Sequence, residues 1–297
     1  MGYLLILVVT GTTTFENVLK KSYSNKYGNG GFIFTAFASF FSFLFFLAKY
    51  LFTDTNKGDF TTALIPYAIA GAFCYAMASI ACYLAYQTGP FALTSLFFSF
   101  SVVVTSVSGI IFFNEPLTIW TIVALVLVVV SVILLKEPKQ QQEEIKSSKK
   151  RKFFWVAMVV TLLITNPAYS VVRKFQQNLF NNTVNNEFML IASALSSIAL
   201  FIIGFIIAKK GSFQVIKKSF PYASLTGISN GASNMLCILL DTLLPLSITS
   251  STRAVLSKGA SFALGHFLYK EKFVLKQIIG LIIGMIAIVL LNFAPML

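Results

Sequence analysis

One stretch of this sequence occurs twice, with an offset of 155 residues between the copies. The matching segments are Pro66-Tyr67-Ala68 with Pro221-Tyr222-Ala223, Cys82 with Cys237, Leu84 with Leu239, Pro90 with Pro245, Thr94-Ser95 with Thr249-Ser250 and, one inserted residue later, Gly109 with Gly265 and Glu115 with Glu271. Because the matches keep their spacing over most of each copy, they indicate an internal duplication. The chain is therefore expected to fold as two versions of one structural unit.

The repeated unit is too apolar for a soluble domain. Hydrophobic residues make up 57% of the chain and charged residues only 11%, whereas soluble domains carry about 25% charged residues. Apolar runs of about 20 residues, the length at which a helix crosses ~30 Å of hydrocarbon, recur from Tyr3 to the C-terminal end. The predicted spans are 3–21, 31–52, 61–87, 90–113, 117–136, 153–174, 187–209, 220–242, 245–269 and 275–294.

Ten spans in two copies give each copy an odd number of spans. An odd number forces the second copy into the opposite orientation, as in the inverted repeats of many secondary transporters. We therefore predict an all-α membrane protein of ten transmembrane helices in two inverted five-helix repeats. The first repeat is assigned to residues 1–136, a charged linker to 137–152 and the second repeat to 153–297.

The distribution of the net charge of +13 favours a membrane topology over nucleic-acid binding. Lysines and arginines gather in alternate loops, and the densest group lies in the central linker. The basic residues assigned to the opposite side are Lys49, Lys57, Arg173 and Lys174. Since positively charged loops stay in the cytoplasm, we predict a multi-pass protein of the cell (plasma) membrane with a cytoplasmic linker and both termini outside.

Each copy ends with a glutamate-containing break and a last span that has small residues four positions apart. The residues concerned are Asn114-Glu115-Pro116-Leu117-Thr118 with Ala124 and Val128, and Glu271 with Gly280 and Gly284. Together with the ten spans and the duplication, this pattern resembles the EamA-type transporters of the drug/metabolite transporter superfamily. The resemblance implies a ten-helix inverted-repeat bundle that moves a small organic solute by alternating access. It also implies cytoplasmic termini, and on this point we follow the charge distribution instead.

Two charges near the middle of the ninth predicted span, Arg253 and Lys258, indicate a site. A charge at that depth costs roughly 2.5–3.5 kcal/mol on insertion scales, and the matching positions of the first copy are apolar. We interpret the pair as an electropositive patch that holds a carboxylate or phosphate of a solute. This placement resembles that of a lysine in the nucleotide-sugar and sugar-phosphate branches of the superfamily. The alternative is an ion pair with Asp241 or Glu16 that locks helices together.

Polar residues at helical spacing mark one face of the eighth span and the matching face of the third. They are Asn230, Asn234, Cys237 and Asp241 on the eighth span and Tyr75, Ser79, Cys82 and Tyr86 on the third. Steps of three or four residues keep each set on one side of its helix. The amides and hydroxyls would hydrogen-bond a solute, and the tyrosine rings would stack on it. The alternative is hydrogen bonding between helices, and Asp241 by itself is expected at the membrane boundary.

The first and sixth spans add further candidates. Asn17 on the first span and Tyr169 on the sixth extend the predicted solute site. Pro167 should kink the sixth span, because proline removes a backbone hydrogen bond, and a kink beside a cavity would suit a gate. Glu16 is a candidate proton-coupling carboxylate. Lys20, one turn later, offers Glu16 an ion pair as the alternative role.

These observations predict a secondary active transporter of a small organic metabolite, with an anionic solute as the sharper hypothesis. The first alternative is an exporter of amino acids or amphipathic drugs that relies on aromatic recognition. The remote alternative is a membrane-embedded enzyme, for which the sequence has no zinc-protease motif, no paired intramembrane aspartates and no nucleotide-binding loop. We expect no cofactor, no metal and no nucleic-acid partner. The expected partners are a small-molecule solute and the lipid bilayer, with the chain as a monomer or a homodimer.

Overall fold

The computed structural model describes most of the chain as helices. The described residues are 2–27, 31–52, 61–88, 101, 104–115, 118–134, 149–207, 212–246, 248–250, 252–253, 255–257, 260 and 274–293. No strand occurs among them, so the all-helical prediction is confirmed for this part of the chain.

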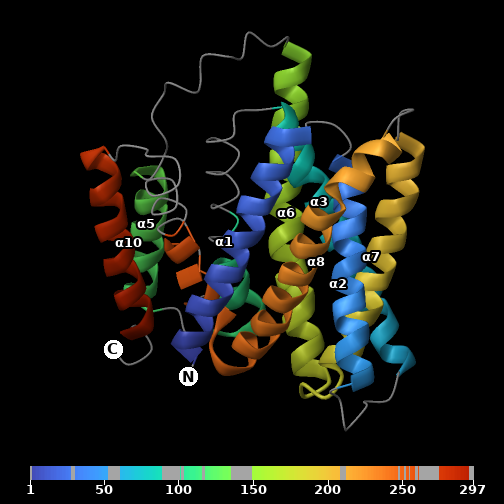
Figure 1. Ribbon diagram of the computed structural model, residues 1–297. Coiled ribbons are helices and arrows are strands. Elements are labelled where there is room, and N and C mark those ends of the chain that lie inside the picture. Colours follow the sequence, from blue (N-terminus) through green and yellow to red (C-terminus); the bar gives the residue numbers. More distant parts are fainter. Residues whose placement is uncertain are drawn as a thin grey trace. The chain divides into compact units, whose positions relative to one another are not determined.

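Most of the predicted spans coincide with helices (Figure 1). The helices are α1 (Gly2–Tyr27), α2 (Gly31–Phe52), α3 (Ile65–Thr88) preceded by the short 3-10 helix η1 (Thr62–Leu64), a helix at Val104–Phe113, α5 (Ile119–Leu134), α6 (Lys149–Leu179), α7 (Asn185–Ile207), α8 (Ser212–Leu243) and α10 (Leu275–Phe293). Much of the predicted spans 90–113 and 245–269 lies outside the described residues. Several helix ends differ from the predicted spans. The helices α1 and α6 end later than predicted, α6 and α8 begin earlier, and α6 begins inside the segment assigned to the linker.

Four helical stretches of the described residues are long and apolar enough to cross a bilayer: Gly31–Phe52, Thr62–Ala85, Lys152–Leu179 and Asn185–Ile207. Large apolar side chains remain exposed along them, for example Ile198, Ile202 and Phe205 on α7. Water would penalise such a surface, whereas lipid tails would not. These helices therefore belong to a membrane protein.

The helices divide into two compact units. The first unit contains Met1–Gly11, Leu84–Pro167 and Leu243–Leu297, and the second contains Thr12–Tyr83 and Ala168–Thr242. Each unit takes segments from both copies of the sequence repeat. Three helices, α1, α3 and α6, pass from one unit to the other within their length.

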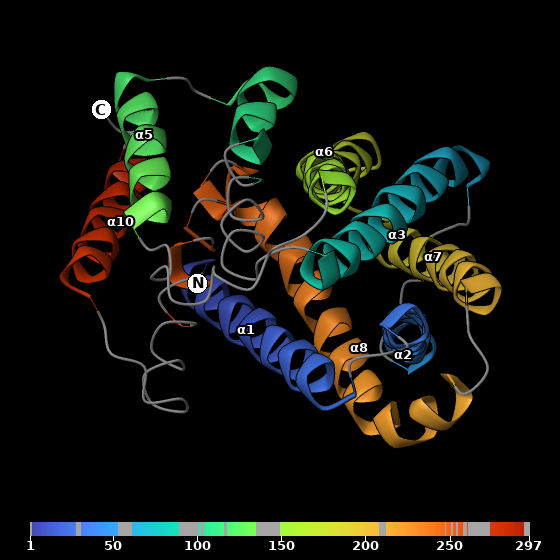
Figure 2. The same ribbon diagram turned by 90° about the horizontal axis from the view of Figure 1, so that it is seen from above.

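In the second unit, α2 and α7 lie side by side (Figure 2). Their apolar side chains join those of α3 and α8 in a core, of which Phe46, Phe188 and Ile238 are buried members. The helix α8 crosses α2 closely, because a Cβ atom on Gly227 would collide with the backbone carbonyl of Ala38. Gly227 thus permits a close crossing of the two helices.

In the first unit, α5 and α10 form the main pair (Figure 2). Ala124 and Val128 of α5 pack with Ala287 of α10. The hydroxyl of Ser131 donates a 2.7 Å hydrogen bond to the backbone carbonyl of Gly280. A Cβ atom on Gly284 would lie 2.6 Å from the Ser131 Oγ atom. The small residues of α5 and α10 therefore allow these helices to approach each other closely.

Glu115 links the two copies within the first unit. Its Oε1 atom accepts a 2.5 Å hydrogen bond from the backbone N–H of Leu246, in the first turn of the helical segment after Pro245. A carboxylate is a favourable partner for the free N–H groups of a helix start. Gly109 leaves the necessary room, since a Cβ atom there would lie 2.6 Å from the carboxylate. Glu115 therefore caps this helical segment and joins residues of the two sequence copies, while Glu271 lies outside the described residues.

Candidate functional site

A narrow cavity opens inside the second unit, between α2, α3, α6, α7 and α8. It is lined by Ser42, Tyr75, Tyr169, Met189, Ala192, Ser193, Ser196, Asn230 and Asn234. No side chain of this lining carries a formal charge. The free space between the side chains suits ordered water. An organic solute would have to push side chains apart to enter.

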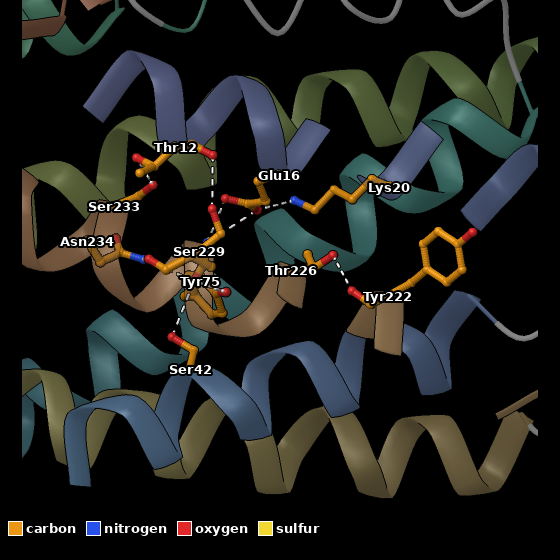
Figure 3. A network of polar contacts seen from close by, with 11 residues as sticks. Thr12, Glu16, Lys20, Ser42, Tyr75, Tyr222, Thr226, Ser229, Ser233 and Asn234 are labelled. Carbon is orange, nitrogen blue, oxygen red and sulfur yellow. Dashed lines mark hydrogen bonds and ion pairs between the residues drawn. The ribbon is translucent and has the colours of Figure 1, made fainter. Parts of the chain in front are cut away.

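Asn230 is the centre of the hydrogen bonds around the cavity. Its Oδ1 atom accepts hydrogen bonds from the hydroxyl of Tyr75 at 2.9 Å and from the hydroxyl of Ser42 at 3.4 Å. Asn234, one turn further along α8, donates through Nδ2 to the same oxygen and to the backbone carbonyl of Asn230, both at 3.0 Å. One side chain thus connects α8 to α3 and α2 (Figure 3).

The other end of the Asn230 amide faces a carboxylate. Its Nδ2 atom lies 3.3 Å from both Oε1 and Oε2 of Glu16, which is buried on α1. Lys20, about half exposed, forms the predicted ion pair with Glu16 at 2.5 Å. The structure therefore shows the alternative role of Glu16, the ion pair with Lys20, and in addition a contact with the cavity lining through Asn230 (Figure 3).

Two further bonds hold α1 against α8 beside this carboxylate. The hydroxyl of Ser233 donates to Oγ1 of Thr12 at 2.7 Å, and the hydroxyl of Ser229 donates to the Thr12 backbone carbonyl at 3.0 Å. Such bonds fix the height of one helix against the other, and therefore the position of Glu16 relative to Asn230.

Two tyrosines form the aromatic wall of the cavity. The rings of Tyr75 and Tyr169 lie with centroids 5.6 Å apart and planes inclined by 55°. The Tyr169 hydroxyl donates to the Met189 sulfur at 3.6 Å. On the side of Arg173, the guanidinium carbon lies 5.7 Å from the centre of the Tyr169 ring.

Arg173 corrects one assignment from the sequence. It was counted with the positive charges on one side of the membrane, at the end of the predicted span 153–174. The structure places it inside α6, almost fully buried, in an ion pair with Asp241 of α8. The Asp241 Oδ2 atom accepts from the guanidinium at 2.8 Å and 2.6 Å, and Lys174 donates to the Asp241 backbone carbonyl. Asp241, expected at the membrane boundary, is therefore part of a buried contact between two helices.

The same contacts bear on the pairing that was left open for the ninth span. The alternative role of Arg253 and Lys258 was an ion pair with Asp241 or Glu16. In the structure, Asp241 is bonded to Arg173. Glu16 is bonded to Lys20 and Asn230.

The predicted site residues are only partly brought together. Tyr75, Tyr169, Asn230 and Asn234 line one cavity, and Glu16 reaches it through Asn230. Ser79, one turn from Tyr75 on α3, is half-buried and is not part of the lining.

The remaining candidates lie elsewhere or are not described. Arg253 is half-buried in the first unit. Pro167 is buried within α6 and is the last residue of the segment Leu84–Pro167 of that unit. Lys258 and the side chains of Asn17 and Tyr86 lie outside the described residues.

The other five residues of the lining were not predicted from the sequence. Ser42 comes from the phenylalanine-rich helix α2, and Met189, Ala192, Ser193 and Ser196 come from α7. The only available signal was the presence of small hydroxyl residues in otherwise apolar spans. Ser196 lies 3.2 Å from Ser39, oxygen to oxygen, which makes these hydroxyls part of the contact between α2 and α7.

The described residues hold no group of three or more histidine, cysteine, aspartate or glutamate side chains that would bind a metal ion. The lining is therefore suited to hydrogen bonding and aromatic contact.

Part of the chain is similar to a known protein family. The first 136 residues match the EamA-like transporter family. These residues are a little under half of the 297-residue chain. They contain α1, α2 and α3, which supply Glu16, Ser42 and Tyr75 to the site. The family points to a membrane transporter of small substrates rather than to an enzyme.

The fold of the chain also has a relative among solved structures. A structure titled "Crystal structure of protein" aligns with a TM-score of 0.75 and covers 99% of this chain and 97% of its own, at 12% sequence identity. At that identity the likeness concerns the fold alone. No curated protein matches the chain.

Proposed function

We propose that the protein is a secondary active transporter that binds a small organic metabolite in the cavity of the second unit and carries it across the membrane by alternating access. The observation that carries this proposal is the hydrogen bond between Tyr75 and Asn230, which are 155 residues apart. This separation equals the repeat offset, so the two residues occupy the same position in the two copies. Equivalent residues of two repeats meet only near the axis that relates the repeats, which is where transporters with inverted repeats bind their solutes.

The helices that would have to move also support this proposal. The first span of each copy changes from one compact unit to the other directly after a residue that weakens helices, Gly11 in α1 and Pro167 in α6. Glycine lowers helix stability and proline removes a backbone hydrogen bond. Bending at these two points would change access to the cavity without disrupting the core of either unit. In this proposal the chain has ten transmembrane helices in two inverted repeats.

The cavity supports the alternative solute class over the anionic one. Its lining presents tyrosine rings, amides and hydroxyls and contains no lysine or arginine. An anion taken from water into such a site would have no charge to compensate it. Recognition by aromatic and amide groups, as in an exporter of amino acids or amphipathic molecules, is therefore the form of transport that we propose. The topology of the proposal follows the charges: a protein of the cell membrane with a cytoplasmic linker, extracytoplasmic termini and one or two copies of the chain.

Alternating access predicts that a cysteine in the cavity reacts from either side of the membrane. In a chain with Cys74, Cys82 and Cys237 replaced by alanine, Ser193→Cys should react with an impermeant thiol reagent applied inside or outside proteoliposomes, because both access states are sampled. Ser197→Cys is the matched control, since Ser197 is also buried on the same helix but does not line the cavity. Reaction from one side only, under all conditions, would argue for a closed-ended pocket and against transport through this cavity.

A further inference from the structure

We propose that the cavity recognises a hydrogen-bond donor, the primary amine of a solute that also carries an aromatic or apolar group. This inference rests on the proposed function and names the chemical class of the substrate. The inference depends on which donors and acceptors of the cavity lining already form hydrogen bonds inside the protein.

The orientation of the Asn230 amide is fixed by Glu16. An ionised carboxylate paired with Lys20 can only accept hydrogen bonds, so the amide must turn its Nδ2 atom toward Glu16, as the 3.3 Å distances show. The Oδ1 atom then faces the cavity side and takes the hydroxyl hydrogens of Tyr75 and Ser42. With Glu16 charged, Asn230 offers a solute no N–H group.

The other donors of the lining are committed as well. Asn234 uses Nδ2 for the Oδ1 atom and the backbone carbonyl of Asn230. The Tyr169 hydroxyl donates to Met189, and the hydroxyls of Ser193 and Ser196 donate to backbone carbonyls of their own helix. The hydrogen-bonding atoms of the lining that stay available to a solute are therefore acceptors. They include the lone pairs of the Ser193 hydroxyl oxygen and the Asn234 Oδ1 atom, which takes no hydrogen bond from any described residue. The Ser196 oxygen is already bonded to the hydroxyl of Ser39.

A lining of acceptors selects the chemistry of its ligand. A protonated primary amine brings three N–H donors and no acceptor. It is also attracted to the faces of aromatic rings such as Tyr75 and Tyr169. A carboxylate or phosphate brings only acceptors, so it would enter without hydrogen bonds and at a large desolvation cost. The cation nearest the aromatic wall, Arg173, is paired with Asp241 and so offers an anion little free charge.

The test compares three probes of similar size that differ in the polar group: 2-phenylethylamine, 2-phenylethanol and 3-phenylpropanoate. Binding to the purified full chain is measured by calorimetry. We expect 2-phenylethylamine to bind at least ten-fold more tightly than 3-phenylpropanoate, with 2-phenylethanol between them.

Two variants test the residues behind this preference. Asn234→Leu removes the free acceptor, and Glu16→Gln removes the charge that orients the Asn230 amide. Each should weaken binding of 2-phenylethylamine about ten-fold. Ser224→Ala on the same helix, whose hydroxyl bonds Pro221 away from the cavity, should leave it unchanged.

Any of three results would overturn the assignment. The first is 3-phenylpropanoate binding as tightly as 2-phenylethylamine. The second is no measurable binding of 2-phenylethylamine, and the third is binding of 2-phenylethylamine that Asn234→Leu leaves unchanged. Either result leaves the accessibility of Ser193→Cys as a separate measurement, so failure of the amine assignment and failure of the transport proposal are distinguishable.

Discussion

Replacing Arg173 with methionine is expected to destabilise the protein by about 3–5 kcal/mol, because the change leaves the Asp241 carboxylate buried without its partner. Both side chains are almost fully enclosed, with exposed fractions of 4% and 2%. The pair also ties α6 to α8 directly beyond the aromatic wall of the cavity, where Arg173 contacts the Tyr169 ring. The free energy of unfolding is measured by titration with a denaturing detergent.

The double variant Arg173→Met/Asp241→Leu separates the ion pair from general disruption of the contact. Since it removes both charges together, it should recover much of the loss caused by Arg173→Met. Lys20→Met is a useful comparison, because Lys20 is about half exposed and its pair with Glu16 lies within one helix. Its cost should be smaller than that of Arg173→Met. Equal costs for the two single variants would show that the buried pair has no special structural importance.

Replacing Asn230 with leucine is expected to lower solute transport by roughly ten- to a hundred-fold. Loss of a hydrogen bond to a charged group costs about 1.5–3 kcal/mol, and Asn230 bonds the Glu16 carboxylate. The substitution also frees Tyr75 and Ser42, which now share the Asn230 oxygen, and so disturbs the cavity lining itself. Initial transport rates in proteoliposomes give the comparison.

The control for this variant is again Ser224→Ala, which removes a hydroxyl of α8 away from the cavity. Both variants are checked for a single species on size-exclusion chromatography, so that a folding defect is not mistaken for a loss of transport. Normal transport by a well-folded Asn230→Leu variant would mean that these hydrogen bonds only hold helices together.

Helix positions could be predicted from the sequence because the lengths of apolar runs match the thickness of a bilayer. The span 31–52 coincides with α2, and 275–294 differs from α10 by one residue at its end. The prediction failed where charged residues continue a helix. The predicted span ends at the charged pair Arg173 and Lys174, but α6 extends to Leu179, since Arg173 finds a buried partner in Asp241.

Part of the candidate site could also be predicted. Tyr75, Asn230 and Asn234 were found because the duplication and the helical spacing place them on matching faces. Ser42 and Ser193 were missed because serine in an apolar span carries no charge and no periodic signal. Their position depends on which faces of α2 and α7 turn toward the cavity, and that is decided by packing between distant segments.

The predicted electropositive patch of the ninth span, Arg253 and Lys258, rests on charge alone. A buried charge indicates that some role exists, but it does not say which cavity the charge serves. Arg253 belongs to the first compact unit, and the described cavity lies within the second. The hydrogen-bonding atoms of the cavity lining are therefore the better basis for the solute class.

The most direct test of the account is transport by the purified chain in proteoliposomes. The vesicles are offered a defined mixture of isotope-labelled amino acids, aromatic amines, nucleosides, sugars, sugar phosphates and organic acids, and their contents are analysed by mass spectrometry. The account predicts that at least one amine-bearing solute accumulates chemically unchanged, faster than in protein-free vesicles and in vesicles with Asn230→Leu. Absence of any such accumulation, or recovery of the solutes in chemically altered form, would contradict it.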